Sequence, residues 1–328
     1  MDNIRLGTIG SGQIVHSILD AAAQTENICL EAVYSRTEAK GRDLAKAYGA
    51  EKVYTDLDAF LKDEAVNFVY VASPNNLHYE YSKKALLAGK NVLCEKPFCT
   101  RYEQAQELFE IADEKGLYLI EMVPTGFLPN FPVLKEAVSK IGRVKLVIGN
   151  YTQYSARYDK LLAGEKPNVF NAEFAGGCLM DINYYNVYLT LALFGEPKRG
   201  EYYPNMFDGV DTSGNMVMAY DGFVATLAGA KDCRGDSFYQ IEGEKGFVNV
   251  VGGSNGLSEI RVVADGKDET INLQPNPDRW FYEIQQLVPM ILSGDKAVFA
   301  NNRQLALIQT ALIESSRKAA GIVYPGDK

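Results

Sequence analysis

Three residues have the types and positions for proton-transfer chemistry. Lys96 stands in the run Glu95-Lys96-Pro97, just past the carboxyl end of an apolar strand, and Asp181 and Tyr185 lie four residues apart in a segment with helical spacing. Residues i and i+4 share a helix face, so both side chains can point to one site. A tyrosine with a pKa of about 10 is a poor base at neutral pH, and a neighbouring ammonium lowers that pKa. Lysine, aspartate and tyrosine are residue types that can give or take a proton, so these three are candidates for such chemistry.

Each of these residues also has an ordinary structural explanation. A lysine in a loop is most often a solvated charge, and Tyr185 with its tyrosine neighbours has the spacing of packing residues on a helix. His78 begins a predicted helix, where it would serve as a cap or a packing residue, and His16 lies inside the first predicted helix. With 2 histidines in the chain, a histidine-rich zinc site is not expected, and the proposed chemistry needs no metal.

The strongest binding signal is a glycine-rich turn near the start of the chain. Gly10-Ser11-Gly12 lies directly between a predicted strand and a predicted helix. Gly10 allows a tight turn, Gly12 lets the backbone approach a pyrophosphate, and the helix start supplies free N–H groups. Val15 stands where the usual pattern has a third glycine, which weakens the motif. An ordinary glycine-rich turn is the alternative, and the location at a strand–helix junction is the main argument against it. The expected dinucleotide contacts here are Gly10, Ser11, Gly12, Gln13 and Ile14.

The end of the second predicted strand indicates which dinucleotide binds. An NAD enzyme usually has an acidic residue there for the ribose 2′-hydroxyl, but Glu31 comes too early, inside the strand. Ser35 and Arg36 instead offer a hydroxyl and a guanidinium, which suit a 2′-phosphate. NADP(H) is therefore favoured, NAD(H) remains possible, and Arg36 as a plain solvated loop residue is the alternative.

Strands and helices alternate in the first part of the chain. Strands are expected at 4–9, 29–34, 52–54, 68–72, 91–94 and 117–122, with helices at 12–23, 37–48, 56–61, 77–88 and 100–115. Regular alternation in short units predicts a doubly wound parallel sheet of the Rossmann type. The expected first domain is 1–122, which binds the dinucleotide.

The pattern changes after Pro124. We expect a helix at 131–140, a long strand at 144–154, helical spacing at 176–194 and a run of strands over 202–273, with two closing helices at 278–292 and 301–318. Asp221-Gly222 and Asp265-Gly266 are the best hairpin signals. The second domain, 123–328, is therefore predicted to be α+β with a mostly antiparallel open sheet that binds substrate and forms dimer contacts.

Composition limits the possible classes of protein. Of 328 residues, 47% are hydrophobic and 23% are charged, as in ordinary globular proteins, and no apolar run is long enough to cross a membrane. The net charge of -9 argues against nucleic acid and anionic membranes as partners. An N-terminus without a signal pattern and 5 irregularly spaced cysteines favour a cytoplasmic location.

Two further segments carry a family resemblance. One runs Ser73-Pro74-Asn75 to His78 and continues, after a helix, into Glu95-Lys96-Pro97; the other is 176–185, with Asp181 and Tyr185. Together with Gly10-Ser11-Gly12, they resemble the glucose-fructose oxidoreductase, inositol dehydrogenase and rhizopine catabolism (Gfo/Idh/MocA) family over essentially the whole chain. Tyr185, where many members have histidine, is similar to the dihydrodiol and xylose dehydrogenase branches, and Asn183 replaces a glycine and puts the substrate match in doubt.

The resemblance implies an NAD(P)-dependent oxidoreductase that moves a hydride between the nicotinamide and a secondary alcohol or ketone of a sugar, polyol or diol. It implies Tyr185 as the acid/base, Lys96 as its proton relay and Asp181 as the polar support. Tyr151, Gln153, Tyr154 and Arg157 are expected to line the substrate pocket, although an exposed strand face explains them equally well. The remaining cofactor contacts would be Ser73, Pro74, Asn75, His78, Glu95 and Lys96.

Two other functions stay open. Some relatives of this family bind the dinucleotide but act as sensors or regulators, and others reduce a conjugated pigment as biliverdin reductase does. Joint retention of Lys96, Asp181 and Tyr185 favours an enzyme. The alternating apolar residues of 216–230 suit a covered sheet face, so the expected partners are a small-molecule substrate and a second copy of the chain.

Overall fold

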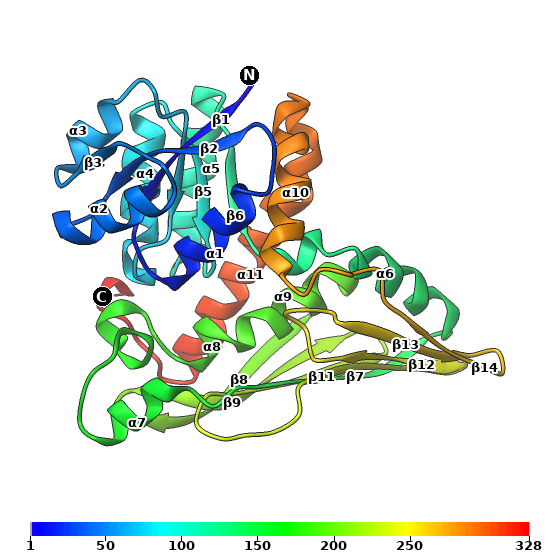
Figure 1. The fold of residues 1–328 in the computed structure, drawn as a ribbon. Coiled ribbons are helices and arrows are strands. Elements are labelled where there is room, and N and C mark those ends of the chain that lie inside the picture. The colour runs from blue at the N-terminus through cyan, green and yellow to red at the C-terminus, as the bar shows by residue number, and fades with distance from the viewer. Residues whose placement is uncertain (1, 328) are drawn as a thin grey trace. The chain divides into compact units, whose positions relative to one another are not determined.

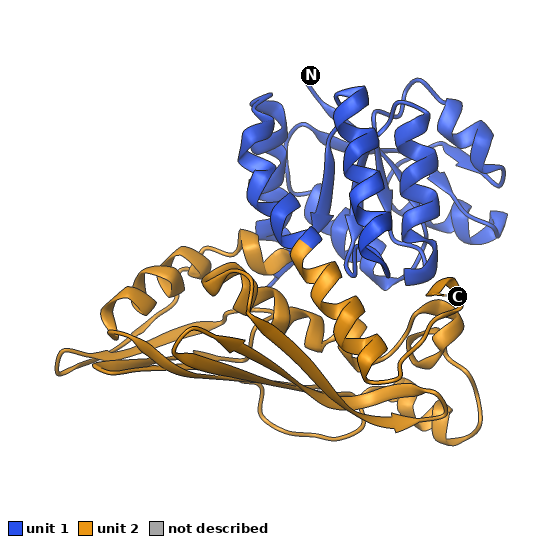
Figure 2. Ribbon diagram, turned by 180° about the vertical axis from the view of Figure 1, so that it is seen from behind, with its two compact units in different colours: residues 1–123, 278–307 blue, residues 124–277, 308–328 orange. Residues whose placement is uncertain are grey.

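The computed structural model describes residues 2–327 and divides the chain into two compact units. Unit 1 comprises Met1–Val123 and Asp278–Leu307, and unit 2 comprises Pro124–Pro277 and Ile308–Lys328 (Figure 2). In residues 2–327 no helix combines the length and the apolar character needed to cross a bilayer.

Unit 1 is built on a six-stranded parallel sheet in the order β3-β2-β1-β4-β5-β6. The strands are β1 (Ile4–Ile9), β2 (Ile28–Tyr34), β3 (Lys52–Tyr54), β4 (Phe68–Val71), β5 (Asn91–Glu95) and β6 (Leu119–Met122). This order reverses between β1 and β4, and open sheets of this kind bind ligands beyond the carboxyl ends of the strands at that switch point. The predicted doubly wound sheet is confirmed.

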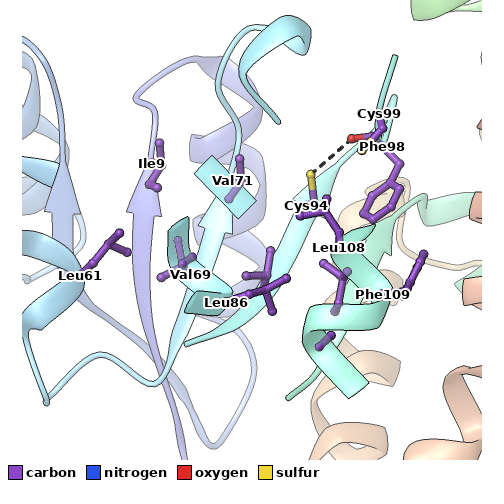
Figure 3. Close-up of a cluster of buried hydrophobic side chains, with 14 of the residues drawn as sticks. Ile9, Leu61, Val69, Val71, Leu86, Cys94, Phe98, Cys99, Leu108 and Phe109 are labelled. Atoms are coloured by element: carbon purple, nitrogen blue, oxygen red, sulfur yellow. Dashed lines mark hydrogen bonds between the residues drawn. The ribbon is translucent and has the colours of Figure 1, made fainter. Parts of the chain in front are cut away.

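The helices between these strands follow the predicted alternation. They are α1 (Gln13–Ala22), α2 (Glu38–Ala47), α3 (Leu57–Lys62), α4 (His78–Leu87) and α5 (Tyr102–Lys115), with a short 3-10 turn, η1 (Asn75–Leu77), before α4. Apolar side chains from β1, β4, β5, α4 and α5 form the core of the unit (Figure 3). All four residues of β4 are buried, as expected for a central strand covered on both faces.

Helix α10 (Arg279–Leu292) and the start of α11 (Ala300–Ala319) also belong to unit 1, although they follow unit 2 in the sequence. Helix α10 packs on α1, and the Gln285 side chain donates to the carbonyl of Gln24 at 2.9 Å. Asn302 binds the backbone of Glu121 on the edge strand β6 through both its amide oxygen and its amide nitrogen. The compact units thus depart from the expected division, in which everything after residue 122 formed one domain.

Unit 2 contains an eight-stranded sheet in the order β14-β13-β12-β11-β7-β10-β9-β8. The strands are β7 (Val144–Thr152), β8 (Arg199–Phe207), β9 (Val210–Tyr220), β10 (Phe223–Ala230), β11 (Phe238–Gly243), β12 (Gly246–Val251), β13 (Glu259–Ala264) and β14 (Lys267–Ile271). Neighbouring strands are antiparallel, apart from the parallel pair of β7 and β10. The predicted mostly antiparallel sheet is confirmed.

The helices of unit 2 are α6 (Asn130–Lys140), α7 (Ala156–Leu162), α8 (Cys178–Asp181) and α9 (Asn183–Phe194), followed by the rest of α11. Short 3-10 turns are η2 (Pro124–Phe127), η3 (Asn168–Phe170), η4 (Ala172–Phe174) and η6 (Pro325–Asp327), with η5 (Lys296–Phe299) in unit 1. Helices α6 and α9 lie on the same face of the sheet (Figure 1).

Turn residues explain how the long hairpins close. At Asp265-Gly266 both residues have positive φ, 52° and 75°, as a type I′ turn requires. At Asp221-Gly222 the glycine has a φ of 88° but Asp221 stays in the ordinary region, so this hairpin closes differently. Asp208-Gly209, with φ of 46° and 83°, makes a third hairpin between β8 and β9 that we had not predicted.

Candidate active site

Unit 1 presents the glycine turn at its switch point. Gly10 has a φ of 121°, and a Cβ built on it would lie 2.5 Å from the carbonyl oxygen of Ala72, so this position accepts glycine alone. Gly12 is the N-cap of α1, and a Cβ added there would meet nothing within 4 Å. The first turn of α1 has no acidic residue and no side-chain cap. Open space in front of free N–H groups fits the pyrophosphate of a dinucleotide.

The residues around this turn have different exposures. Ser11 and Ile14 are half-buried, while Gly12 and Gln13 are exposed. Val15, in the place of the third glycine, is completely buried in the unit core, where it lies on the inner face of α1. The substitution therefore affects helix packing and leaves the mouth of the turn open.

Ser35 and Arg36 follow β2 directly. The Ser35 hydroxyl donates to the Thr37 carbonyl at 2.9 Å and accepts from the Thr37 N–H at 3.3 Å, and its side chain is buried. Arg36 is exposed. The hydroxyl thus shapes the loop, and the guanidinium is the group of this pair that an incoming phosphate can reach.

Three loop residues and one histidine follow β4. Ser73, Pro74 and Asn75 are half-buried. His78 is buried, with Nδ1 2.8 Å from the carbonyl oxygen of Pro97 and Nε2 2.9 Å from that of Ser73. Burial lowers the pKa of His78. The neutral ring therefore lies between the loop after β4 and the loop after β5 and donates to one of the two carbonyls, which is a supporting role.

Lys96 stands between a buried carboxylate and a buried proline. Glu95 ends β5 with its side chain buried, and Lys96 is half-buried and joined to Pro97 by a cis peptide bond. Tyr70 on β4 is completely buried and donates a 2.6 Å hydrogen bond to Glu95. Burial raises the pKa of Glu95, opposed by the Tyr70 hydrogen bond and the charge of Lys96. Glu95 thus faces the protein interior beside the lysine and shapes its electrostatic surroundings.

A second buried carboxylate lies near Glu95 and was not foreseen. Glu283 on α10 is completely buried, and neither of its carboxylate oxygens has a hydrogen-bond partner. Burial, reinforced by the charge of Glu95, holds the pKa of Glu283 well above its usual range. Its position in a helix far along the sequence gave no signal that it would face the end of β5.

Unit 2 carries the other predicted chemical residues. The expected single helix over 176–194 is broken: α8 ends at Asp181, Ile182 intervenes and α9 begins at Asn183. Asp181 and Tyr185 therefore lie on either side of this interruption, where Ile182 itself keeps a right-handed helical conformation. The exposed fraction of the Asp181 side chain is 30%.

Asp181 forms an ion pair that the sequence did not predict. The ammonium of Lys231, just after β10, donates to the Asp181 carboxylate, and the exposed fraction of the Lys231 side chain is 6%. A lysine directly after a largely apolar strand was the one available signal, and Lys96 also follows an apolar strand.

Tyr185 is buried against a second tyrosine. Its ring meets that of Tyr151 edge-on, with 6.0 Å between the ring centroids. The Tyr151 hydroxyl accepts from the Asn255 amide at 2.6 Å and donates to Gln153 at 3.3 Å. Of the residues expected to line a pocket, Tyr151 thus supports Tyr185 directly.

The other two expected pocket residues are engaged locally. Tyr154 donates a hydrogen bond to Asp159, and the Arg234 guanidinium lies 5.3 Å from the Tyr154 ring centroid. Arg157 is exposed, and its backbone N–H contacts the Ser155 hydroxyl at the start of α7. These contacts order the loop after β7.

Asn183 has a structural role. It is completely buried, donates to the carbonyl of Leu227 at 3.0 Å and accepts from Asn186 at 2.9 Å. A Cβ added at Gly229 would come within 2.6 Å of the Asn183 Cβ, so the bulk of Asn183 is accommodated by this glycine on β10. The Asn183 side chain therefore faces the sheet and is held there by these two hydrogen bonds.

The short helix α8 is held at its start by residues from distant segments. The Asp211 carboxylate accepts from the Leu179 N–H and from the Tyr202 hydroxyl, each at 2.7 Å. The Tyr324 hydroxyl, near the C-terminus, donates to the carbonyl of Gly176 at 3.0 Å. Asp181 therefore lies on an element whose position depends on β8, β9 and the C-terminal tail.

Two family models match the chain. Residues 4–122 match a model described as an oxidoreductase family with the NAD-binding Rossmann fold. Residues 134–249 match the GFO/IDH/MocA C-terminal domain. The two matches correspond to the parallel sheet of unit 1 and to most of the second sheet.

Curated relatives match along the full length. An NADP-dependent scyllo-inositol 2-dehydrogenase of Bacillus subtilis is 35% identical over 328 residues, covering 99% of both chains. An uncharacterised oxidoreductase of Escherichia coli is 32% identical, covering 99% of this chain and 98% of its own. An NADP-dependent D-xylose 1-dehydrogenase of Haloferax volcanii is 26% identical, covering 97% and 98%.

Solved structures share the fold. A 3-ketoreductase from Actinomadura kijaniata in complex with NADP and TDP-benzene superposes with a TM-score of 0.83 at 24% identity, covering 96% of this chain and 97% of its own. Biliverdin reductase from Synechocystis gives a TM-score of 0.82 at 17% identity, covering 97% and 99%. With both family models matched and a full-length relative at 35% identity, the chain belongs to the Gfo/Idh/MocA oxidoreductase family.

Proposed function

We propose that the protein is an NADP(H)-dependent dehydrogenase or reductase acting on a secondary alcohol or ketone of a sugar, polyol or diol. The observation that carries the proposal is the open Gly12 position at the N-terminus of α1, at the switch point of a Rossmann sheet. Full-length relatives named as NADP-dependent dehydrogenases of scyllo-inositol and D-xylose support the cofactor and the substrate class.

The 2′-phosphate of the cofactor would bind at the loop after β2. Arg36 is exposed there, and none of the first three residues after the strand is acidic. A guanidinium forms strong, paired hydrogen bonds with phosphate oxygens. These features support NADP(H) over NAD(H).

Three residues would handle the proton. When bound, the nicotinamide supplies or accepts the hydride. By the family resemblance, Tyr185 takes or gives the hydroxyl proton, Lys96 relays a proton, and Asp181 accepts a hydrogen bond from the substrate. The Glu95 and His78 contacts around Lys96, and the Tyr151 ring beside Tyr185, support this assignment by fixing the elements that carry these groups.

A cofactor-by-substrate screen tests the function. Purified protein is mixed with NADP⁺ or NAD⁺ and a panel of inositols, pentoses and diols, and the reduced nicotinamide is followed by its absorbance. We expect turnover with NADP⁺ on at least one polyol and its loss in Tyr185→Phe, which removes only a hydroxyl. Binding of NADPH without any turnover would instead indicate a sensor, and bleaching of a biliverdin-type pigment would indicate pigment reduction.

We also propose that two copies pair through the open face of the second sheet. Leu146 lies directly opposite Val224, and with Ile148 and Tyr203 these apolar side chains keep exposed fractions of 46%, 39%, 36% and 58% respectively. Exposed apolar patches of this kind mark association surfaces. In sedimentation, Ile148→Glu should give monomers while Leu87→Glu, an exposed leucine on α4, should not; a wild-type monomer would refute the pairing.

The cytoplasm is the proposed location. All five cysteines are unpaired, and three of them are buried. Unpaired thiols are usual in a reducing compartment. Fractionation of the source cells, with detection of the protein, checks this assignment.

A further inference from the structure

The buried lysine beside Asp181 has no place in the proton scheme described above. Lys231 follows the last residue of β10, where its backbone N–H donates to Thr212 and its carbonyl accepts from Ser155, both at 2.9 Å. Neighbouring strand β9 and the start of α7 thus hold its backbone on both sides. A residue fixed in this way can aim its side chain with little freedom.

The Lys231 side chain is almost completely buried. Its ammonium pairs with the Asp181 carboxylate and lies 5.6 Å from the centroid of the Phe170 ring. Phe170 is itself buried. Removing an ammonium from water is costly unless a charge and further contacts compensate it, and here a carboxylate and a ring face do so.

Other acidic groups around this lysine have neutral donors of their own. Asp211 accepts from Leu179 and Tyr202, and Asp232 accepts from the hydroxyls of Thr212 at 2.7 Å and Ser213 at 2.9 Å. The Cys178 thiol, which feels the charges of Asp211, Lys231, Asp181 and Asp232, is buried. Asp181 is the carboxylate that Lys231 contacts, and it retains partial exposure.

We infer that Lys231 is a positioning residue of the active site, which holds Asp181 ionised and in one orientation for a substrate hydroxyl. This inference rests on the proposed function. An ionised carboxylate only accepts hydrogen bonds, so a site arranged in this way selects a substrate group that donates one. The substrate is thereby expected to carry a hydroxyl that donates to Asp181, and analogues lacking that hydroxyl should be poor substrates.

The inference predicts a specific pattern of kinetic effects. Lys231→Met keeps the length and apolar stem of the side chain but removes its charge, and Lys231→Arg keeps the charge. Lys231→Met should lower kcat/KM by about ten- to hundredfold, as loss of an orienting partner does, and Lys231→Arg should restore most of it. The acid limb of the kcat/KM profile should move to higher pH in Lys231→Met, because the carboxylate loses its cation. NADPH affinity should stay unchanged.

A double-mutant cycle separates this role from a merely structural one. If Lys231 acts through Asp181, adding Lys231→Met to Asp181→Asn should cost little more than Asp181→Asn alone. Independent losses in the two variants, or a lower melting temperature with an unchanged pH profile, would overturn the inference. So would full activity of Lys231→Met.

A measurement that needs no turnover keeps the inference separate from the proposed function. With ¹³C-labelled aspartate carboxyls, the Asp181 signal, assigned by its loss in Asp181→Asn, is titrated in wild type and in Lys231→Met. A higher titration midpoint in the variant supports the inference that Lys231 keeps Asp181 ionised, even if the substrate screen fails. Equal midpoints would overturn it even if the screen succeeds.

Discussion

The Tyr70 hydroxyl donates a 2.6 Å hydrogen bond to the Glu95 carboxylate, and both side chains are buried beside the candidate catalytic lysine. Glu283 approaches the same place from α10 without a hydrogen-bond partner. Two carboxyl groups in one apolar interior cannot both be charged cheaply. The pKa values of both carboxyls are therefore raised, and the stability of the protein should depend on pH through them.

Glu283→Gln should stabilise the protein by an amount that grows with pH. Burial and the charge of Glu95 raise the pKa of Glu283 in the folded state, so the stability this carboxyl supports is complete below about pH 4.3 and is lost as the pH rises toward the folded pKa. Glutamine is neutral throughout. The difference in unfolding free energy should therefore increase with pH above about pH 4.3 in urea titrations. The exposed Glu103→Gln should show no such slope, and a constant difference would contradict the prediction.

Two glycines of the same turn should respond in opposite ways. Gly10→Ala places a Cβ against the Ala72 carbonyl at positive φ and should destabilise the free protein by about 1–3 kcal/mol. Gly12→Ala enters open space and should cost under about 1 kcal/mol of stability. It should nevertheless weaken NADPH at least about tenfold, because the methyl group takes the space of the pyrophosphate. Urea denaturation gives the stability of each variant, and fluorescence titration gives its affinity for NADPH. Tight NADPH binding by Gly12→Ala would show that the pyrophosphate does not lie at Gly12.

Arg36→Glu should discriminate between the two cofactors. A hydrogen bond to a charged group contributes about 1.5–3 kcal/mol, so NADPH should weaken by about tenfold or more, and the new carboxylate should repel the 2′-phosphate further. NADH affinity should change little. The ratio of the two dissociation constants, measured by calorimetry, is the test, and equal weakening of both would remove Arg36 from the 2′-phosphate site.

Lys96→Ala should separate binding from chemistry. Because general acid–base groups contribute about 10²–10⁴-fold, turnover should fall by that range while NADPH affinity stays near wild type. The measurement is kcat on the polyol identified in the screen. Lys90→Ala would be an unsuitable control, because the buried Lys90 ammonium donates to two backbone carbonyls. Lys115→Ala, at the exposed end of α5, is the matched control. Unchanged turnover in Lys96→Ala would disprove its catalytic role.

Asn183→Ala should reduce stability rather than substrate affinity. It removes the side-chain donor of the buried Leu227 carbonyl and one of the two acceptors of the Asn186 amide, which costs about 1–3 kcal/mol. KM should remain that of the wild type. The exposed Asn76→Ala serves as control in the same urea experiment. A large change in KM at constant stability would instead show that Asn183 contacts the substrate.

Local sequence patterns predicted the elements well and their long-range neighbours poorly. The six parallel strands and the glycine turn follow from apolar runs, helix caps and turn residues within short windows. The assignment of α10 to unit 1 depends on Gln285 reaching Gln24, more than two hundred residues away, and no window contains both. Family resemblance named Lys96, Asp181 and Tyr185, but the resemblance carried no information about their neighbours.

The break between α8 and α9 shows the physical reason for such misses. Helical spacing over 176–194 is real, yet Asp181 turns toward Lys231 while Asn183 turns toward the β10 carbonyls. These partners lie 50 and 44 residues away in the chain, so no local sequence pattern contains them. Lys231 was missed for the same reason, since its partner lies 50 residues away.

The two hydrogen bonds between Asn302 and strand β6 also affect how the protein folds during its synthesis. Strand β6 is the edge of the first sheet, and Asn302, which covers its backbone at Glu121, is synthesised 181 residues later. At roughly 5–20 residues per second, a ribosome takes on the order of ten to forty seconds to supply it. During that interval the nascent chain carries an uncovered strand edge, the usual starting point for wrong pairing between chains. Slow or paused translation of the second sheet would therefore prolong the period in which new copies are most prone to aggregate.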